Sequence, residues 1–320
     1  MVSGPTGAFD VGHGADGDPV RHVPVLSDEV RALLEPERGG VFVDGTVGLG
    51  GHARMLLDGG ADLLIGLDRD AEALAHARAA LQGFGDRVTL AHADYRALGA
   101  VLDARGVAAV DGMLLDLGVS SLQLDAEGRG FSFRRDEPLD MRMDRSHGTT
   151  AAERLATVEE TKLADVIYRF GEERKSRRVA RAIVEARRAA PIERTGQLAT
   201  IVRRAVGGPW QRIDPATRTF QALRIWVNGE LDGLETALDG AVSRLRSPSG
   251  DRAGGRLAVI SFHSLEDRVV KHAFRGMAGG DRPRVRVLTR RPIVAGDEER
   301  AANPRARSAK LRGVECVAAA

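Results

Sequence analysis

A glycine-rich turn between a short apolar strand and a helix constrains the fold of this chain more than any other feature. The apolar residues 41–43 end on Asp44 and lead into four glycines, Gly45, Gly48, Gly50 and Gly51. An amphipathic segment follows at once, so the pattern predicts a strand, a tight turn and a helix. Glycines let the backbone approach a ligand closely, and a helix N-terminus offers N–H groups to an anion. We therefore expect a nucleotide-type cofactor here.

The acid at the end of the strand indicates which cofactor. Gly48 and Gly50 fit a dinucleotide fingerprint, but this pattern is weak by itself. A pyrophosphate in the turn would meet the carboxylate of Asp44, and like charges repel. A cofactor that carries an ammonium and a sulfonium would be attracted instead. The order Asp-Gly-x-x-Gly-x-Gly is also similar to motif I of S-adenosylmethionine (SAM) methyltransferases. An ordinary glycine-rich turn without a ligand is the remaining interpretation.

Three more acids follow predicted strands. The strands are residues 63–68, 88–93 and 110–115, and the acids are Asp68, Asp94 and Asp116. Strands that alternate with helices predict an α/β fold, with a doubly wound, Rossmann-like parallel sheet that binds ligands at the carboxyl ends of its strands. Asp68 stands where such a fold places the acid that binds ribose hydroxyls. Tyr95 directly follows Asp94 and is suited to stack on an adenine.

Beyond Asp116 the pattern becomes loop-rich and then helical. We expect one long helix that opens at Asp214-Pro215 and continues past Leu234. Strand patterns return at residues 256–262, and two short strands near 285–288 and 314–317 are expected to close the sheet as an antiparallel pair.

These patterns predict three regions. We expect residues 21–130 and 215–320 to form the α/β domain and residues 131–214 to form an inserted all-helical domain. Residues 1–20 are rich in Gly and Asp, so we expect a disordered leader.

Charge and cysteine content narrow the class of protein. The formal net charge is only +2, yet residues 174–188 hold seven Lys/Arg against one acid, and residues 282–312 hold ten against three. Clustered arginines suggest a polyanionic partner. For the first cluster a solvated helix face is an equally good interpretation, and the segment 303–312 is the stronger indication. The single cysteine, Cys316, excludes an intrachain disulfide and a cysteine metal cluster. No apolar run is long enough to span a membrane and no signal peptide is visible, so we expect a cytoplasmic protein without a membrane partner.

Seven sequence blocks together resemble one family. They are DGTVGLGGH at 44–52, DGMLLDLGVSS at 111–121, RGFSF at 129–133, PLDMRMD at 138–144, FQALRI at 220–225, SFHSLEDR at 261–268 and NPRARSAKLR at 303–312. The chain closely resembles the bacterial ribosomal RNA small-subunit methyltransferase H family, also called MraW. The resemblance implies a class I SAM methyltransferase core and methylation of the exocyclic N4 of cytidine 1402 in 16S ribosomal RNA. It also implies RNA of the small ribosomal subunit, and not DNA, as the partner.

The same resemblance implies the cofactor contacts. The residues that it assigns to SAM are Gly50, Gly51, His52, Asp68, Tyr95, Asp116 and Gln123. The glycines fit backbone N–H groups that meet the methionine carboxylate, and Asp68 fits the ribose. His52 and Gln123 carry no independent signal of this role.

The reaction can be narrowed by chemistry. Methylation at cytosine C5 needs a cysteine nucleophile. The only cysteine, Cys316, stands in a predicted edge strand near the C-terminus and is a poor candidate for this role. An exocyclic amine needs only alignment and an acceptor for its N–H groups, and a carboxylate is a natural partner of cytosine N4. We assign the role of N–H acceptor to Asp116. The alternative role for this residue is to bind the ammonium of SAM. Phe131, Phe133 or the loop 261–263 is expected to hold the base.

Several alternatives stay open at this point. His263 is a candidate general base, although the methylated amine loses its proton without one, and no metal ion is required. A dinucleotide-dependent oxidoreductase and a non-catalytic RNA-binding protein are the two other functions considered. The helical insertion suits RNA binding and also suits a homodimer.

Overall fold

The computed structural model describes residues 10–13, 19–21, 24–208 and 214–317. The chain divides into two compact units, one of Met1–Gly118 with Gly233–Ala320 and the other of Val119–Asp232. Disorder was predicted for residues 1–20, but β1 (Asp10–His13) and β2 (Pro19–Arg21) form an antiparallel pair there. The other leader positions lie outside the described residues.

The first unit is built on a seven-stranded sheet. Its strands run in the order β5 (Val88–His92), β4 (Leu63–Asp68), β3 (Val41–Asp44), β6 (Gly112–Asp116), β7 (Arg256–Ser261), β9 (Lys310–Cys316) and β8 (Val285–Val287). The first five strands are parallel, and β9 is antiparallel to both of its neighbours. The apolar runs of β3, β4, β6 and β7 are buried, as the inner strands of a parallel sheet require, whereas the edge strand β5 is only partly buried.

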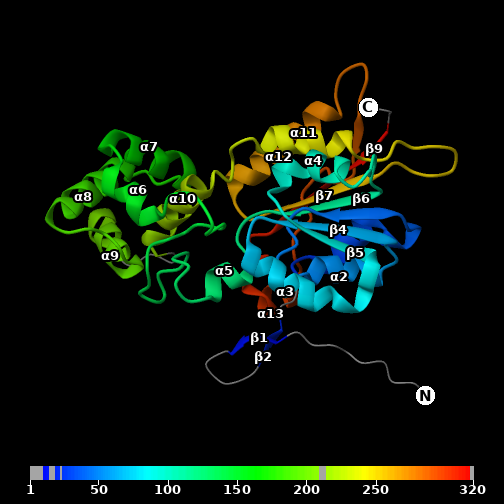
Figure 1. Ribbon diagram of the computed structural model, residues 1–320. Helices are drawn as coiled ribbons and strands as arrows, with labels where there is room; N and C mark the ends of the chain where they lie inside the picture. Colours follow the sequence, from blue (N-terminus) through cyan, green and yellow to red (C-terminus); the bar gives the residue numbers. More distant parts are fainter. Residues whose placement is uncertain (1–9, 14–18, 22–23, 209–213, 318–320) are drawn as a thin grey trace. The chain divides into compact units, whose positions relative to one another are not determined.

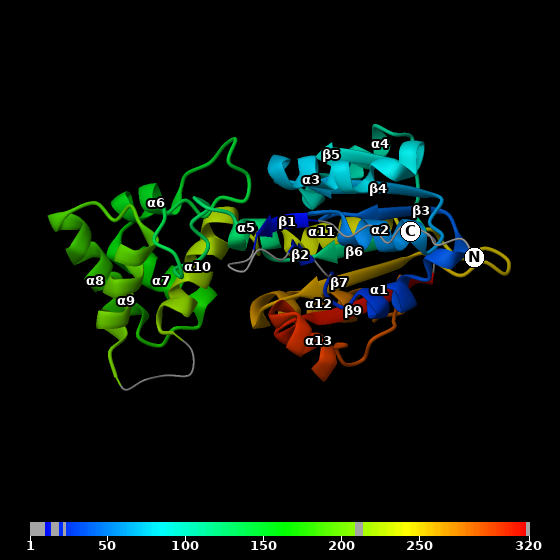
Figure 2. The same ribbon diagram turned by 90° about the horizontal axis from the view of Figure 1, so that it is seen from below.

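Helices cover both faces of this sheet (Figures 1 and 2). One group, which Figure 1 shows below the sheet, is α2 (Gly51–Asp58), α3 (Ala71–Leu81) and α13 (Asp297–Ala302), with α1 (Ser27–Leu34) packed on α2 and β7. The opposite group is α4 (Leu98–Asp103), α11 (Leu234–Ser243) and α12 (Ser264–Met277). The α/β doubly wound architecture predicted from the sequence is therefore confirmed. None of the helices in the described ranges has the length and apolar character that a bilayer crossing requires.

Two predicted elements differ from the structure. The expected long helix ends at Asn228, because Gly229 adopts φ 57° and turns the chain, and α11 begins only after Gly233 at φ 68°. The last strand starts at Lys310 and lies between β7 and β8. Cys316 is therefore 5% exposed in an inner strand, and the expectation of an edge strand was wrong.

The second unit is helical around its own apolar core. Its helices are α5 (Ser121–Asp125), α6 (Ala151–Thr157), α7 (Glu160–Gly171), α8 (Ser176–Ala189), α9 (Thr195–Val206) and α10 (Ala216–Asn228). The core includes Leu163, Ile183 and Leu223, which all have no exposed surface. This unit is wider than the predicted insertion, residues 131–214, because α10 packs on α7 and the loop before α6 folds onto the same core.

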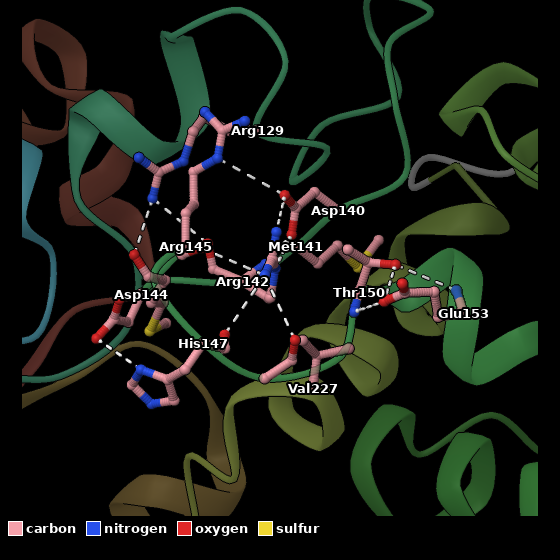
Figure 3. Close-up of polar contacts among 12 residues, drawn as sticks. Arg129, Asp140, Met141, Arg142, Asp144, Arg145, His147, Thr150, Glu153 and Val227 are labelled. Atoms are coloured by element: carbon pink, nitrogen blue, oxygen red, sulfur yellow. Dashed lines mark hydrogen bonds and ion pairs between the residues drawn. The ribbon is translucent and has the colours of Figure 1, made fainter.

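That loop is held by an arginine network (Figure 3). Arg142 donates to both carboxylate oxygens of Asp140, at 2.7 and 3.0 Å, and to the carbonyls of residues 145, 147 and 148. Arg129, 1% exposed, donates to the carbonyl of Met143 at 3.0 Å. Asn228 ties the loop to α10, since its side chain accepts from Met143 N–H and donates to the carbonyl of Met141. These contacts satisfy backbone groups that no helix or strand pairs.

Two glycines of this loop give a matched test of its packing. Gly130 and Gly128 have nearly equal φ values of 74° and 75°. A Cβ at Gly130 would lie 2.6 Å from Asp140 N and Pro138 O, whereas nothing lies within 4 Å of a Cβ at Gly128. Gly128→Ala should therefore lower the free energy of unfolding by only the positive-φ cost of about 1 kcal/mol. Gly130→Ala should lower it by about 1–3 kcal/mol more. Equal midpoints in thermal unfolding of the two variants would contradict this account.

Candidate cofactor site

The glycine-rich turn after β3 is bonded to both neighbouring strands. Gly45 N–H donates to the carbonyl of Leu114 at 2.9 Å, and Val47 N–H donates to the carbonyl of Leu67 at 2.8 Å. Gly48 N–H donates to Asp68 Oδ2 at 2.8 Å. Gly48 and Gly50 adopt φ 51° and 88°, which glycine alone reaches without strain. The turn is thus fixed at the carboxyl ends of β4, β3 and β6, where an α/β sheet binds its ligands.

Two carboxylates at these strand ends have an oxygen without a partner. Asp44 is 1% exposed and Asp116 is half-buried. Within the described structure, Asp44 Oδ2 and Asp116 Oδ1 are buried and accept no hydrogen bond. Burial raises the pKa of Asp44 to about 7, and Asp68 nearby adds to the shift. Burial, with Asp44 and Glu266 nearby, raises the pKa of Asp116 well above its ordinary value of 3.8. A pair of desolvated acids of this kind is a site for a cation.

Thr46 connects these two acids, and sequence reasoning missed it. Its N–H donates to Asp44 Oδ1 at 3.1 Å, and its Oγ1 accepts the N–H of Asp116 at 2.6 Å. The available signal was its position two residues after an aspartate, where an Asx-type turn forms. Because Thr46 occupies only Oδ1 of Asp44, the other oxygen is left for a ligand.

Asp68 at the end of β4 is arranged as an acceptor. Its oxygens accept the N–H groups of Gly48 at 2.8 Å and Asp70 at 2.9 Å. Burial raises its pKa to about 6 against these two hydrogen bonds, which lower it. Each carboxylate oxygen has two lone pairs, so Asp68 retains capacity for a pair of hydroxyl donors.

Tyr95 begins the segment after β5 and lies against the turn. Its Cβ is 3.2 Å from the position that a Cβ would take at Gly45. Burial raises the pKa of Tyr95 to about 12, and the guanidinium of Arg96 lies 5.1 Å from its ring centroid. Asp94 caps this segment by accepting the N–H of Arg96 at 2.9 Å, so this fourth strand-end acid has a structural partner.

His52 lies on the first turn of α2 and faces the acids. It is 6% exposed, and its Nε2 lies 3.7 Å from Asp116 Oδ2. Gly50 precedes the helix and no side chain caps it. The first N–H groups of α2, from Gly51 onward, are therefore where an anionic group is favoured.

These groups match the charges of the expected cofactor. SAM carries an ammonium, a carboxylate and ribose hydroxyls. The unpartnered oxygens of Asp44 and Asp116 suit the ammonium, the N-terminus of α2 suits the carboxylate, and Asp68 suits the hydroxyls. A pyrophosphate would be opposed by the same two acids. The donor set of the first unit thus fits SAM.

Gln123 and the two phenylalanines belong to the second unit. Gln123, 4% exposed, completes a capping box on α5: its Oε1 accepts from Ser120 N–H, and its own N–H donates to Ser120 Oγ. Phe131, 7% exposed, lies in the helical core, which excludes it as a free stacking surface. Phe133 meets Phe220 edge-on, with ring centroids 4.8 Å apart. The role of Gln123 toward the cofactor stays a prediction.

His263 has a structural role at the start of α12. Its Nδ1 accepts the N–H of Glu266 at 3.3 Å, and Glu266 Oε2 accepts the N–H of His263 at 3.3 Å. This reciprocal capping box accounts for the histidine without a function as a base.

The two basic clusters differ in the structure. Arg312, 7% exposed, donates to Asp267 at 2.7 Å, and Lys310 donates to Asp267 at 3.2 Å. The end of the segment 303–312 is therefore part of the sheet, and its interpretation as an RNA contact is wrong for Arg312. Four arginines on α8 are exposed and are described below.

Known proteins are similar in sequence to this chain over almost its whole length. The family model of the MraW methylase family matches residues 19–317. A ribosomal RNA small subunit methyltransferase H of Nitrobacter hamburgensis is 54% identical and covers 94% of this chain and 92% of its own. Proteins of that name from Sorangium cellulosum and Citrifermentans bemidjiense are 53% and 51% identical; they cover 94% and 92% of this chain and 92% and 98% of their own.

The raised pKa values predict how cofactor affinity depends on pH. Asp44, with a pKa of about 7, and Asp68, with a pKa of about 6, must be ionised to accept from SAM. As the pH falls from 7.5 to 5.5, protonation should weaken SAM binding by at least about tenfold. Calorimetric titration across this range measures the effect. Asp44→Asn should bind SAM more weakly and with a smaller pH dependence, and equal pH profiles for the two proteins would refute the assignment.

Proposed function

Because this chain belongs to the MraW methylase family, we propose that it transfers the methyl group of SAM to the exocyclic N4 of cytidine 1402 in 16S ribosomal RNA. One structural observation carries the chemistry of this proposal. Two acids at adjacent strand ends, Asp44 and Asp116, retain buried oxygens that no group of the described protein satisfies. A cationic methyl donor satisfies them, and a dinucleotide does not.

Each part of the cofactor has a partner in the first unit. SAM supplies an electrophilic methyl group on a sulfonium. Gly50 and Gly51 bring the N-terminus of α2 to the carboxylate, and Asp68 accepts from the ribose hydroxyls. The ring of Tyr95 stacks on the adenine. These contacts orient the methyl group, and orientation is the larger part of catalysis when no covalent step is needed.

The two acids differ in burial, and this difference assigns them different roles. Asp44 is fully buried and takes the ammonium, whereas Asp116 is half-buried and faces the incoming base. A bound cation lowers the raised pKa of Asp116, so its carboxylate is ionised when the cytosine arrives. It then accepts an N4–H and holds the amine in line with the methyl group. Cys316 is buried in the sheet, which removes the nucleophile that C5 methylation requires.

Nucleoside analysis tests the reaction directly. Small ribosomal subunits and naked 16S rRNA, both from cells that lack this gene, are incubated with methyl-labelled SAM and digested to nucleosides. Label should appear in N4-methylcytidine. Label in another nucleoside would refute the assignment of N4, and no transfer to either substrate would refute the enzyme activity.

Asparagine variants separate the two acids. Asp116→Asn should lower kcat by about 10²–10³-fold with little change in the KM for SAM, because it weakens an interaction made during transfer. Asp44→Asn should mainly raise the KM for SAM. Asp116→Ala should abolish transfer. Steady-state kinetics on small subunits measure these parameters, and near-normal turnover of Asp116→Ala would disprove its catalytic role.

A further inference from the structure

The outer face of α8 carries a row of arginines. Arg177, Arg178, Arg181 and Arg188 are on this helix, and Arg174 stands in the turn before it. With 3.6 residues per turn, the four positions on the helix fall within about 100° of arc. All five are exposed, while Val179 and Ile183 on the opposite face have no exposed surface. We call these five side chains the α8 arginine row.

Most of these arginines lack the acidic partners that other arginines of the unit have. Elsewhere in the second unit Arg142, Arg194 and Arg203 bind Asp140, Asp136 and Asp214. Within the described residues, no acid pairs with Arg174, Arg177, Arg178 or Arg188. Arg181 lies 3.7 Å from Glu160, and Glu185 is the one acid on the same face of α8. Arg178 lies beside Gly207 at the end of α9.

The row disfavours the helix that carries it. Arg177 and Arg181 are four residues apart on α8, and like charges at this spacing destabilise a helix. Helix stability therefore gives no reason for the arrangement. A partner that neutralises the row would remove the repulsion.

The chemistry of the row selects a phosphate backbone as its partner. The guanidinium group forms paired hydrogen bonds with phosphate oxygens. From Arg177 to Arg188 the helix advances about 17 Å, which spans several phosphates of one strand. The exposed face of α8 offers no large apolar side chain, whereas a protein–protein interface has an apolar or aromatic centre.

We propose that the α8 arginine row binds the sugar–phosphate backbone of the RNA substrate. This inference rests on the proposed function, since it names the surface that holds the same substrate. It assigns the second unit a role in RNA binding that is independent of base identity, because phosphate contacts position a nucleic acid without reading its sequence.

Charge reversal at the three unpaired positions other than Arg178, which lies beside Gly207, tests the proposal. The variant carries Arg174→Glu, Arg177→Glu and Arg188→Glu, and its matched control carries lysine at the same three positions. Binding of a 16S rRNA transcript is measured without SAM at several salt concentrations. The slope of log affinity against log salt should fall in magnitude by about 2 in the reversal variant, since each lost phosphate contact contributes about 0.7–0.9. Affinity at low salt should fall at least about tenfold, and the lysine control should stay close to wild type.

The outcomes discriminate between partners. An unchanged slope in the reversal variant would overturn the proposal. Unchanged RNA affinity together with lost methylation of assembled subunits would place a ribosomal protein on this face and would also overturn it. SAM affinity, measured on the same preparations, should be unchanged and shows that the first unit is folded, and a helix signal in circular dichroism equal to that of wild type shows that the second unit is folded. Because the readout is binding, it stays valid if the methylated atom proves to be different, and failure of methyl transfer is scored separately.

Discussion

Desolvation of two carboxylates is the constraint around which the first unit is organised. Asp44 and Asp116 end adjacent parallel strands, so the sheet brings their charges together at one edge. Thr46 satisfies part of this pair, and Gly48 and Gly50 supply the positive φ angles of the same turn. The remaining buried oxygens are costly unless a cation binds. The site therefore holds a free-energy deficit in the absence of ligand that a positively charged cofactor removes.

The parts of this site that follow from strand endings were predictable from sequence. Short apolar runs that end on an acid define both the sheet and its functional edge, so Asp44, Asp68 and Asp116 were identified without the structure. Thr46 was not identified, because its role depends on a hydrogen bond to a strand 70 residues away. His52 carried no signal of its own in the sequence, yet it is buried beside Asp116. Periodicity reports neither contact.

The boundaries of the insertion show a second limit of pattern reasoning. Residues 117–148 were expected to be loop-rich, and α10 was expected to begin a long helix that continues past Leu234. The structure instead ends α10 at Gly229, which adopts a left-handed conformation, and Asn228 ties the preceding loop to α10 through Met141 and Met143. These two contacts join residues more than 80 positions apart, whereas Arg142 orders the loop locally through Asp140. The same unit presents the α8 arginine row, so its apolar faces build a core while one charged face is left for a partner.

A crystal structure of the complex with SAM tests the central claim most directly. The account predicts that the ammonium nitrogen lies within hydrogen-bond distance of Asp44 Oδ2, with the ribose hydroxyls on Asp68 and with Asp116 Oδ1 left for the cytosine amine. A bound cofactor whose ammonium is directed away from Asp44, with Asp44 Oδ2 still unsatisfied, would contradict the account.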